Sequence, residues 1–357
     1  MDFFEIDFLK TQSKKSADAI PLRYEKNEKI QIHITDGGYQ DDGDNIIGHI
    51  NQYYDSPSRI DAVIVTHPDA DHAGGLKRIL EYYDVVELWM LRPWMYADEI
   101  IDRFSRFTNV DNLKKRLKEI YPSITALEKI AEEKGIPIRE PFQSAKIGEF
   151  TVLAPTKKRY LDLIVESDKT PESIKTLEET LSTVLGKTVR KLLSFIRSRW
   201  GEETFPATGT SPENEMSIIQ YGKLCDKKIL LTGDAGRESL KEAAEYAPNI
   251  GLILPGIDKI QVPHHGSRHN VSTEILDIWL GDRLKNDLDN SRDFEAIVCA
   301  SAQDDDHPRK SVRRGFIHRG GEVFTTENAC IRISINAPQR VGWYPATRLE
   351  YPQEQEE

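Results

Sequence analysis

The sequence predicts an α/β protein with one large core that helical segments interrupt. The chain has 357 residues, which fits one large α/β domain carrying an insertion, or two ordinary domains. Strand patterns alternate with helical patterns near both ends of the chain, whereas the middle is helical and charged. No convincing linker separates the two strand-rich parts. We therefore expect a single domain over residues 1–357, with helical insertions at about 95–145 and 157–210.

The first third of the chain has the pattern of strands separated by turns. Alternating apolar and polar residues predict half-buried strands, and a continuous apolar run predicts a central one. Two segments carry apolar residues at helical spacing, 45–54 and 76–83. The expected strands are 3–9, 18–24, 29–35, 59–66 and 85–91.

The middle of the chain is expected to be helical, with one strand at 151–155. Its helical segments are 96–119, 124–134 and 171–200. The last of these places five apolar residues on one helical face, namely Leu185, Val189, Leu192, Ile196 and Trp200. Residues 201–213 are rich in Gly, Pro, Thr and Ser, which favours a loop.

Strand patterns return after residue 213. A hairpin is expected from 217–221 and 228–232, followed by a helix over 237–246. Further strands are expected at 259–263, 296–300, 322–326 and 330–335. The acidic end, 351–357, is expected to be frayed.

The composition excludes several classes of protein. With Lys+Arg 48 against Asp+Glu 59, the net charge of −11 argues against duplex binding through a broad basic surface, although one local patch stays possible. No run approaches the roughly 18 apolar residues of a membrane span, and no signal peptide is evident. The three cysteines are scattered and odd in number, as is typical of a reducing compartment. We expect a cytoplasmic protein without membrane contact.

The segment from His67 to His72 is the most informative of the chain. It places four potential metal ligands, His67, Asp69, Asp71 and His72, at the carboxyl end of an apolar strand. Open α/β sheets carry their sites at such strand ends, and imidazole with carboxylate suits zinc, manganese or iron. The alternative is a polar turn in which Asp71 caps the next helix. Four ligand types followed by two glycines favour the metal site.

Two later strand ends offer further ligands. Leu230-Leu-Thr-Gly-Asp234 ends in a carboxylate, although such a turn is common and weak by itself. Val262-Pro-His264-His265-Gly-Ser267 ends in adjacent histidines, which packing rarely requires. Three strand ends that each offer His or Asp indicate one shared metal site.

Together these segments resemble the metallo-β-lactamase fold superfamily, and within it the ComEC-type hydrolase domain of DNA-uptake proteins. The H-x-D-x-D-H of residues 67–72 and the P-H-H-G-S of residues 263–267 carry the resemblance. Weaker matches are Ala17-Asp18-Ala19, Ile34-Thr-Asp36-Gly-Gly, Asn214-Glu-Met-Ser217, Leu231-Thr-Gly-Asp234 and His307-Pro308. The matches and the strands between them cover a little over half of the chain. Two departures are the missing Gly-Gln-Gly-Asp loop and the missing middle histidine, since no histidine lies between His72 and His264.

The resemblance implies a four-layer αββα sandwich with a helical insertion, and a site for two divalent ions. His67 and Asp69 would hold the first ion, whereas Asp71, His72 and His265 would hold the second, with Asp234 bridging. It further implies catalytic roles for Asp71, His264 and His307, and substrate contacts for Asn214, Ser267 and Arg268. The sequence leaves open whether His264 or His265 is the ligand; we favour His265, with His264 contacting a substrate oxyanion. Asp36 either orients a ligand histidine or bonds its own turn.

The implied function is that of a binuclear phosphodiesterase or nuclease. Two cations, Zn²⁺ foremost and Mn²⁺ as an alternative, lie about 3.5–4 Å apart in such sites and lower the pKa of a shared water. Nucleic acid or a nucleotide-derived diester would be the substrate. The alternatives are hydrolysis of another small ester, and a non-catalytic module whose helical insert binds a protein partner. The insert carries five cations and no acid over residues 186–200, which favours either a path for a polyanion or a solvated helix face.

Overall fold

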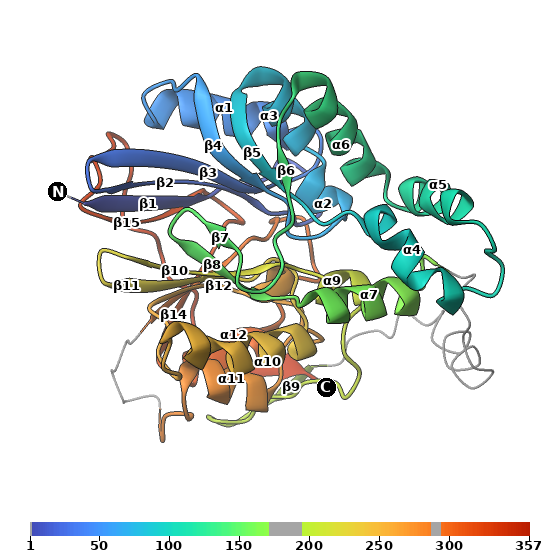
Figure 1. Ribbon diagram of the computed structural model, residues 1–357. Coiled ribbons are helices and arrows are strands. Elements are labelled where there is room, and N and C mark those ends of the chain that lie inside the picture. Colours follow the sequence, from blue (N-terminus) through green and yellow to red (C-terminus); the bar gives the residue numbers. More distant parts are fainter. Residues whose placement is uncertain (1, 171–194, 287–293) are drawn as a thin grey trace.

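Two seven-stranded mixed sheets lie face to face, and helices cover the outer face of each (Figure 1). This computed structural model describes residues 2–170, 195–286 and 294–357. The layers follow the order helix, sheet, sheet, helix, so the predicted αββα sandwich is confirmed.

The first sheet joins strands from both ends of the chain. Its order is β15 (Ile331–Ile335), β1 (Phe3–Phe8), β2 (Ala19–Lys26), β3 (Lys29–Gly37), β4 (Arg59–Ile64), β5 (Asp84–Trp89) and β6 (Ile138–Arg139). The pairs from β3 to β6 are parallel, and the others are antiparallel. The carboxyl ends of β3 and β4 therefore meet at one edge of this sheet.

The second sheet is built from the later part of the chain. Its order is β14 (Gly321–Thr325), β13 (Phe294–Val298), β12 (Lys259–Gln261), β11 (Lys227–Leu231), β10 (Ile219–Leu224), β8 (Phe150–Ala154) and β7 (Lys146–Ile147). Strands β11 to β14 are parallel, so β11 and β12 also end at one edge. A separate pair, β9 (Phe195–Arg197) and β16 (Glu354–Glu356), is antiparallel.

Helices form the two outer layers (Figure 1). The first sheet is covered by α1 (Asp42–Tyr53), α3 (Leu76–Tyr82) and α6 (Pro122–Lys134), and the second by α10 (Arg237–Tyr246), α11 (Thr273–Leu280) and α12 (Lys310–Ile317). The remaining short or peripheral helices are α2 (Ala70–Ala73), η1 (Pro93–Tyr96), α4 (Ala97–Ile100), η2 (Ile101–Arg103), α5 (Val110–Ile120), α7 (Lys157–Glu166), α9 (Pro212–Glu215), η3 (Ala247–Ile250) and η4 (Pro263–Gly266).

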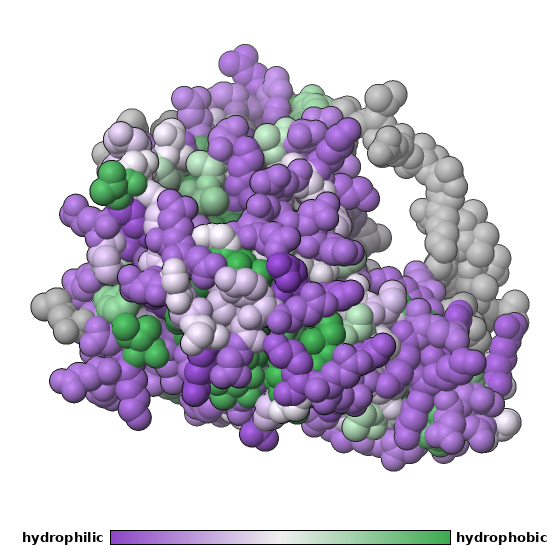
Figure 2. Space-filling model, turned by 90° about the horizontal axis from the view of Figure 1, so that it is seen from above, coloured by the Kyte–Doolittle hydropathy of each residue, from purple (hydrophilic) through white to green (hydrophobic). Residues whose placement is uncertain are grey.

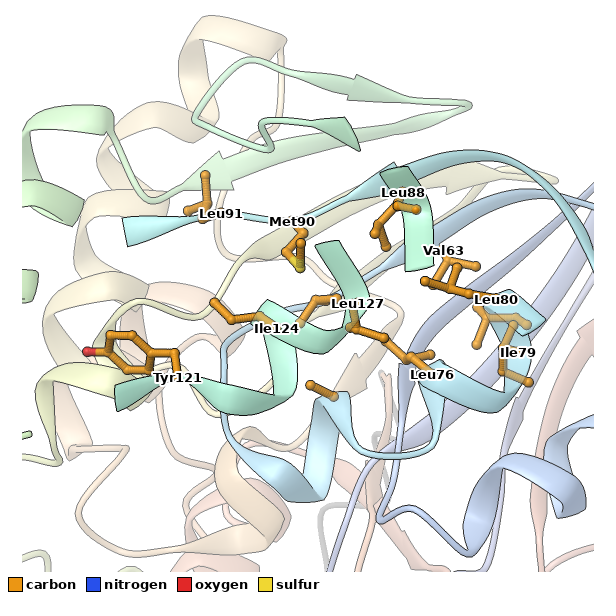
Figure 3. Close-up of a cluster of buried hydrophobic side chains, with 14 of the residues drawn as sticks. Val63, Leu76, Ile79, Leu80, Leu88, Met90, Leu91, Tyr121, Ile124 and Leu127 are labelled. Carbon is orange, nitrogen blue, oxygen red and sulfur yellow. The ribbon is translucent and has the colours of Figure 1, made fainter. Parts of the chain in front are cut away.

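Helix α6 belongs to the outer layer although it lies within the predicted insertion. Its Ile124 and Leu127 are buried in one cluster with Leu76 of α3 and Leu88 of β5 (Figure 3). Apolar residues at helical spacing give α6 this buried face. A second core lies between the sheets, where Phe4, Ile6 and Phe8 meet Ile229 and Leu231.

The prediction of a helix over residues 171–200 is wrong where the structure describes that segment. Residues 195–197 form the strand β9, not the end of a helix over 171–200, because they pair with β16. Leu185, Val189 and Leu192, and the basic residues before Phe195, lie outside the described residues.

The end of the chain is not frayed in the described structure. Residues 351–357 include β16, and the side chains of Gln355 and Glu356 are buried. The Glu356 carboxylate accepts hydrogen bonds from the backbone N–H groups of Lys310 (2.8 Å) and Ser311 (3.0 Å), at the start of α12. A carboxylate at a helix amino terminus is stabilised by the unpaired N–H groups there, and this fixes the acidic segment.

One face of the molecule is mostly hydrophilic. Seen from above, polar residues cover most of the molecule, with small apolar groups scattered between them (Figure 2). Within the described ranges, no helix has the length and apolar content that crossing a membrane requires.

Candidate metal centre

The candidate site lies where both sheets present the carboxyl ends of parallel strands. His67 follows β4, and Asp71 and His72 belong to the short helix α2 behind it. Asp234 follows β11, and His265 lies in η4, directly after β12. Side chains from loops at this edge are free to converge, as they do in other open α/β sheets.

Asp234 is the centre of the cluster. Its Oδ1 lies 3.2 Å from Nε2 of His72. Its Oδ2 lies 3.8 Å from Nε2 of His67 and 2.8 Å from Nδ1 of His264. One buried carboxylate thus faces three histidines that come from both sheets.

A second set of donors surrounds His265. Its Nε2 lies 3.7 Å from Oδ2 of Asp71, and its Nδ1 lies 3.4 Å from Oδ1 of Asp18. The donor atoms form four overlapping groups, within each of which all atoms lie within 4.8 Å of one another. These groups are His67–His72–Asp234, Asp71–His72–His265, Asp18–Asp234–His265 and Asp18–Asp36–His72.

The buried donor atoms fit a divalent metal ion. Among the described residues, Nε2 of His67, His72 and His265 and Oδ1 of Asp18 and Asp234 are buried without a hydrogen-bond partner. Unpartnered buried polar atoms are costly, and native proteins rarely leave several of them in one place. Two ligands that bind one zinc ion lie about 3.3 Å apart, and the separations of 3.2 and 3.8 Å at Asp234 are close to this value. The donor set therefore matches a metal ion better than a structural salt-bridge network.

Hydrogen bonds behind two of the histidines direct Nε2 into the cluster. His72 Nδ1 lies 2.7 Å from Oδ2 of Asp36, and His265 Nδ1 lies 2.9 Å from the carbonyl oxygen of Cys299. Asp36 also accepts from the backbone N–H of Thr66 (2.9 Å) and from its hydroxyl (2.6 Å). These contacts agree with the first of the two roles predicted for Asp36, in which it orients a ligand histidine, here His72. They do not agree with the second role, a hydrogen bond to its own turn.

The charges around the cluster shift several pKa values. Burial alone would lower the pKa of His72, but the charges of Asp234, Asp36 and Asp18 raise it well above its ordinary value. The pKa of His265 is likewise raised, by Asp234 and Asp18 against the effect of burial. The surrounding carboxylates therefore favour the protonated form of both imidazoles. Metal ions compete with these protons, so acid should weaken metal binding.

The backbone turns both adjacent histidines toward the cluster. His264, His265 and Gly266 have φ values of 47°, 54° and 84°, three left-handed residues in succession. For residues other than glycine, the left-handed backbone conformation costs about 1–2 kcal/mol per residue. Such a local cost is typical of functional sites.

Several residues that the sequence singled out lie at the rim. Asp69 is outside the four groups, and its Oδ1 lies 2.5 Å from Nζ of Lys169. His264 is also outside them, but it contacts Asp234 and lies 2.6 Å from Nδ2 of Asn214. His307 Nδ1 lies 3.1 Å from Oδ2 of Asp304.

The two remaining substrate candidates contact nearby backbone. The hydroxyl of Ser267 accepts from the backbone N–H of His269 at 3.3 Å. The Arg268 guanidinium donates to the carbonyl oxygen of Glu357 at 3.1 Å. These contacts place both residues in the loop that follows the histidine pair.

Asp18 joins the cluster although it was not among the predicted ligands. Its Oδ2 accepts from Nε2 of Gln261 at 2.6 Å, which holds the carboxylate toward His265 and His72. The Ala17-Asp18-Ala19 turn was already part of the resemblance. A carboxylate directly before a strand that begins at the same edge was the signal that could have identified it.

Comparisons with known proteins agree with this fold. Residues 34–135 match the model of the metallo-beta-lactamase superfamily. A search of curated proteins gives no match.

Three solved structures illustrate the similarity. The metallo-beta-lactamase fold protein YhfI from Bacillus subtilis is 10% identical, with a TM-score of 0.38, and covers 93% of this chain and 99% of its own. Zn²⁺-bound PqqB from Methylobacterium extorquens is 10% identical, with a TM-score of 0.43, and covers the same shares. A putative metallo-beta-lactamase from Thermotoga maritima is 10% identical, with a TM-score of 0.30, and covers 70% of this chain and 92% of its own.

The family match spans the strand and loop that carry His67 to His72, the segment that begins the site. The two facing mixed sheets and the His/Asp groups at their shared edge agree with that match. Over residues 34–135 the chain is therefore similar to the metallo-β-lactamase superfamily, and the described residues carry a candidate His/Asp metal site.

Proposed function

We propose that this protein is a binuclear metal-dependent hydrolase that cleaves phosphodiesters, with nucleic acid or a nucleotide-derived diester as its substrate. The observation that supports it is the set of overlapping His/Asp groups around Asp234, whose donor atoms are buried without partners. His67, His72, His265 and Asp71 would hold the ions with Asp234. Two divalent ions, Zn²⁺ foremost, supply an activated water and stabilise negative charge on the phosphoryl oxygens.

Cationic side chains near the site support an anionic substrate. Burial lowers the pKa of His269, and the charges of Arg268, Arg237 and Arg309 lower it further, so the positive charge of three guanidinium groups reaches this loop, although Arg309 also pairs with Asp306 at 2.8 Å. Lys169 adds a partly exposed ammonium beside Asp69. In a chain with a net charge of −11, such a local group of cations attracts a phosphate that the remaining surface would repel.

The test is a substrate panel with the zinc-loaded and manganese-loaded protein. The substrates are bis(p-nitrophenyl) phosphate, short single-stranded oligonucleotides and p-nitrophenyl acetate. We expect the two phosphodiesters to be cleaved, and Asp71→Ala to lower kcat/KM on the order of 100-fold or more, because the cluster around His265 loses a carboxylate.

Asp61→Asn is the matched control. Asp61 is also a carboxylate and lies within β4, but its Oδ2 accepts from the backbone N–H of Ile32 at 2.9 Å, and it belongs to none of the four groups. Activity of Asp61→Asn should equal that of the wild type. Cleavage of the acetate ester without any cleavage of the diesters would reject the proposal that the substrates are phosphodiesters. The absence of metal from the purified and reloaded chain would reject the proposal that the protein is a metal-dependent hydrolase.

A protein partner that binds the helical insert stays a prediction from sequence, because much of that segment lies outside the described residues. The same applies to a path for a polyanion along its basic stretch.

A further inference from the structure

A serine, an aspartate and a histidine form a chain of hydrogen bonds beside the candidate metal centre. Ser16 lies in the loop before β2, whereas Asp304 and His307 follow β13, which is parallel to β12 and ends at the same edge of the second sheet. The backbone N–H of Arg309 donates to the carbonyl oxygen of Gly266 at 3.0 Å. This bond holds the segment that carries His307 against the turn of the histidine pair.

The His307 ring consequently lies next to both histidines of that turn. Its centre is 5.7 Å from that of His264 and 6.0 Å from that of His265. Its Nδ1 lies 3.1 Å from Oδ2 of Asp304, and its side chain is 20% exposed. Within the described ranges, Nε2 has no hydrogen-bond partner, and it is not among the buried polar atoms that lack one. Nε2 is therefore open to solvent beside the cluster.

The carboxylate of Asp304 decides which nitrogen of His307 carries a proton. Its Oδ2 also accepts from the hydroxyl (2.7 Å) and the backbone N–H (3.3 Å) of Ser16, and its Oδ1 accepts from the backbone N–H of Asp306 (3.0 Å). A side chain surrounded by donors in this way suits an ionised carboxylate, which can only accept. Nδ1 of His307 therefore donates to Oδ2. In the neutral ring, Nε2 then keeps its lone pair.

The loop that carries Ser16 fixes Asp304 in turn. The Ser16 hydroxyl accepts from the backbone N–H of Ser301 at 3.1 Å, so its own proton is free for Asp304. The Ser301 hydroxyl donates to the carbonyl oxygen of Ser13 at 2.8 Å, which ties the loop to the segment after β13. Residues 11–16 stand where the resemblance implies a Gly-Gln-Gly-Asp loop, so the resemblance does not account for these contacts.

We infer that Ser16 and Asp304 are positioning residues for His307, whose Nε2 accepts a hydrogen bond from the attacking water and orients the water oxygen toward phosphorus. Asp304 acts through Nδ1 of His307, and Ser16 acts through Asp304. Holding a reactant in the productive orientation raises the rate of the chemical step. The inference rests on the hydrolytic part of the proposed function and is independent of which phosphodiester is cleaved.

The first measurement is the hydrolysis of bis(p-nitrophenyl) phosphate by the zinc-loaded protein at pH 8, where an imidazole with the ordinary pKa of about 6.5 is neutral. Asp304→Ala removes the acceptor of Nδ1–H and should lower kcat by about 10–100-fold with little change in KM. Asp304→Asn should keep most of the rate, because its amide oxygen can replace Oδ2, where three donors meet. Ser16→Ala removes the hydroxyl donor and should cause a smaller loss than Asp304→Ala.

Asp306→Ala is the matched control. Asp306 lies in the same loop, and its carboxylate is 59% exposed and pairs with Arg309 at 2.8 Å. Its kcat and KM should equal those of the wild type. Circular dichroism and the zinc content per chain check that each variant is folded and loaded.

Two further measurements separate positioning from a structural role. If Asp304 acts through His307, the double variant Asp304→Ala/His307→Ala should be no slower than His307→Ala alone. ¹⁵N NMR of the imidazole reports which of its nitrogens is protonated. We expect the proton on Nδ1 in the wild type and in Asp304→Asn, and on Nε2 in a substantial fraction of Asp304→Ala molecules.

Wild-type kcat in folded, zinc-loaded Asp304→Ala would overturn the inference. A further loss of rate in the double variant, a proton on Nε2 in the neutral wild type, or an Asp304→Asn variant as slow as Asp304→Ala would also overturn it. A zinc-loaded wild type that hydrolyses no ester would instead reject the proposed function itself, so the two failures are distinguishable.

Discussion

Replacing Asp36 by Asn tests whether the hydrogen bond behind His72 controls the metal site. The carboxylate is fully buried, and its Oδ2 accepts from both the Thr66 hydroxyl (2.6 Å) and His72 Nδ1 (2.7 Å). In the variant, an amide NH₂ at this position cannot accept the hydrogen bond that Nδ1–H of His72 donates. His72 can restore the bond by moving its proton to Nε2, the nitrogen that faces Asp234. The ligand atom would then carry a proton.

The expected loss can be worked out from this arrangement. Removing a partner behind a metal-binding histidine typically weakens metal affinity 10–100-fold. At 1.4 kcal/mol per tenfold change, this corresponds to about 1.4–2.8 kcal/mol of binding free energy. The backbone should contribute little, because Asn tolerates the positive φ of 58° at this position.

Competition with a chromophoric zinc chelator at pH 7 measures the affinity. Asp61→Asn, which leaves the cluster unchanged, serves as the control and should bind zinc as the wild type does. If Asp36→Asn binds zinc within about twofold of wild type, the proposed link between Asp36, the tautomer of His72 and the metal would be refuted.

Three further predictions concern folding. Burial lowers the pKa of His33 to about 4, from 6.5 in the unfolded chain, so protonation favours the unfolded chain. The free energy of unfolding should fall by up to about 1.4 kcal/mol per pH unit as the pH drops from 6.5 to 4, and urea denaturation of His33→Gln should lack this contribution. Leu127→Ala opens a cavity between α6 and the first sheet and should cost about 2–5 kcal/mol in urea, so a change below about 1 kcal/mol would contradict the packing. In Gly75→Ala the new Cβ would lie 2.1 Å from the carbonyl oxygen of Gly37, so Tm should fall, whereas Gly48→Ala, with nothing within 4 Å, should not lower it. Equal Tm values for these two variants would show that the loop around Gly75 moves to accommodate the Cβ, and would contradict the prediction.

Much of the fold could be predicted because its signals are local. The apolar run before His67 and the alternating residues around Lys29 gave strands that the structure contains. Apolar and polar residues alternate along a half-buried strand, so a few consecutive residues suffice to predict the strand. The strand ends in turn predicted where His72, Asp234 and His265 would meet.

The remaining errors come from contacts between distant segments. Asp69 is 100 residues from Lys169, and no local pattern indicates that they pair. Residues 195–197 form a strand because Glu354–Glu356 lie beside them, which their own helical spacing does not reveal. Asp18 joins the cluster through Gln261, which is 243 residues away in the sequence.

The pairing of β1 with β15 has a consequence for biosynthesis. Phe8 lies opposite Ile331, so the first strand of the sheet receives its outer neighbour only after synthesis has passed Ile331. At 5–20 residues per second, the edge of β1 waits roughly 15–65 s for that partner. An unpaired strand edge is a template for aggregation, so the edge of β1 is exposed to this risk during the interval. Slowing translation ahead of Ile331 should therefore lower the yield of native protein, measured as soluble product per chain synthesised.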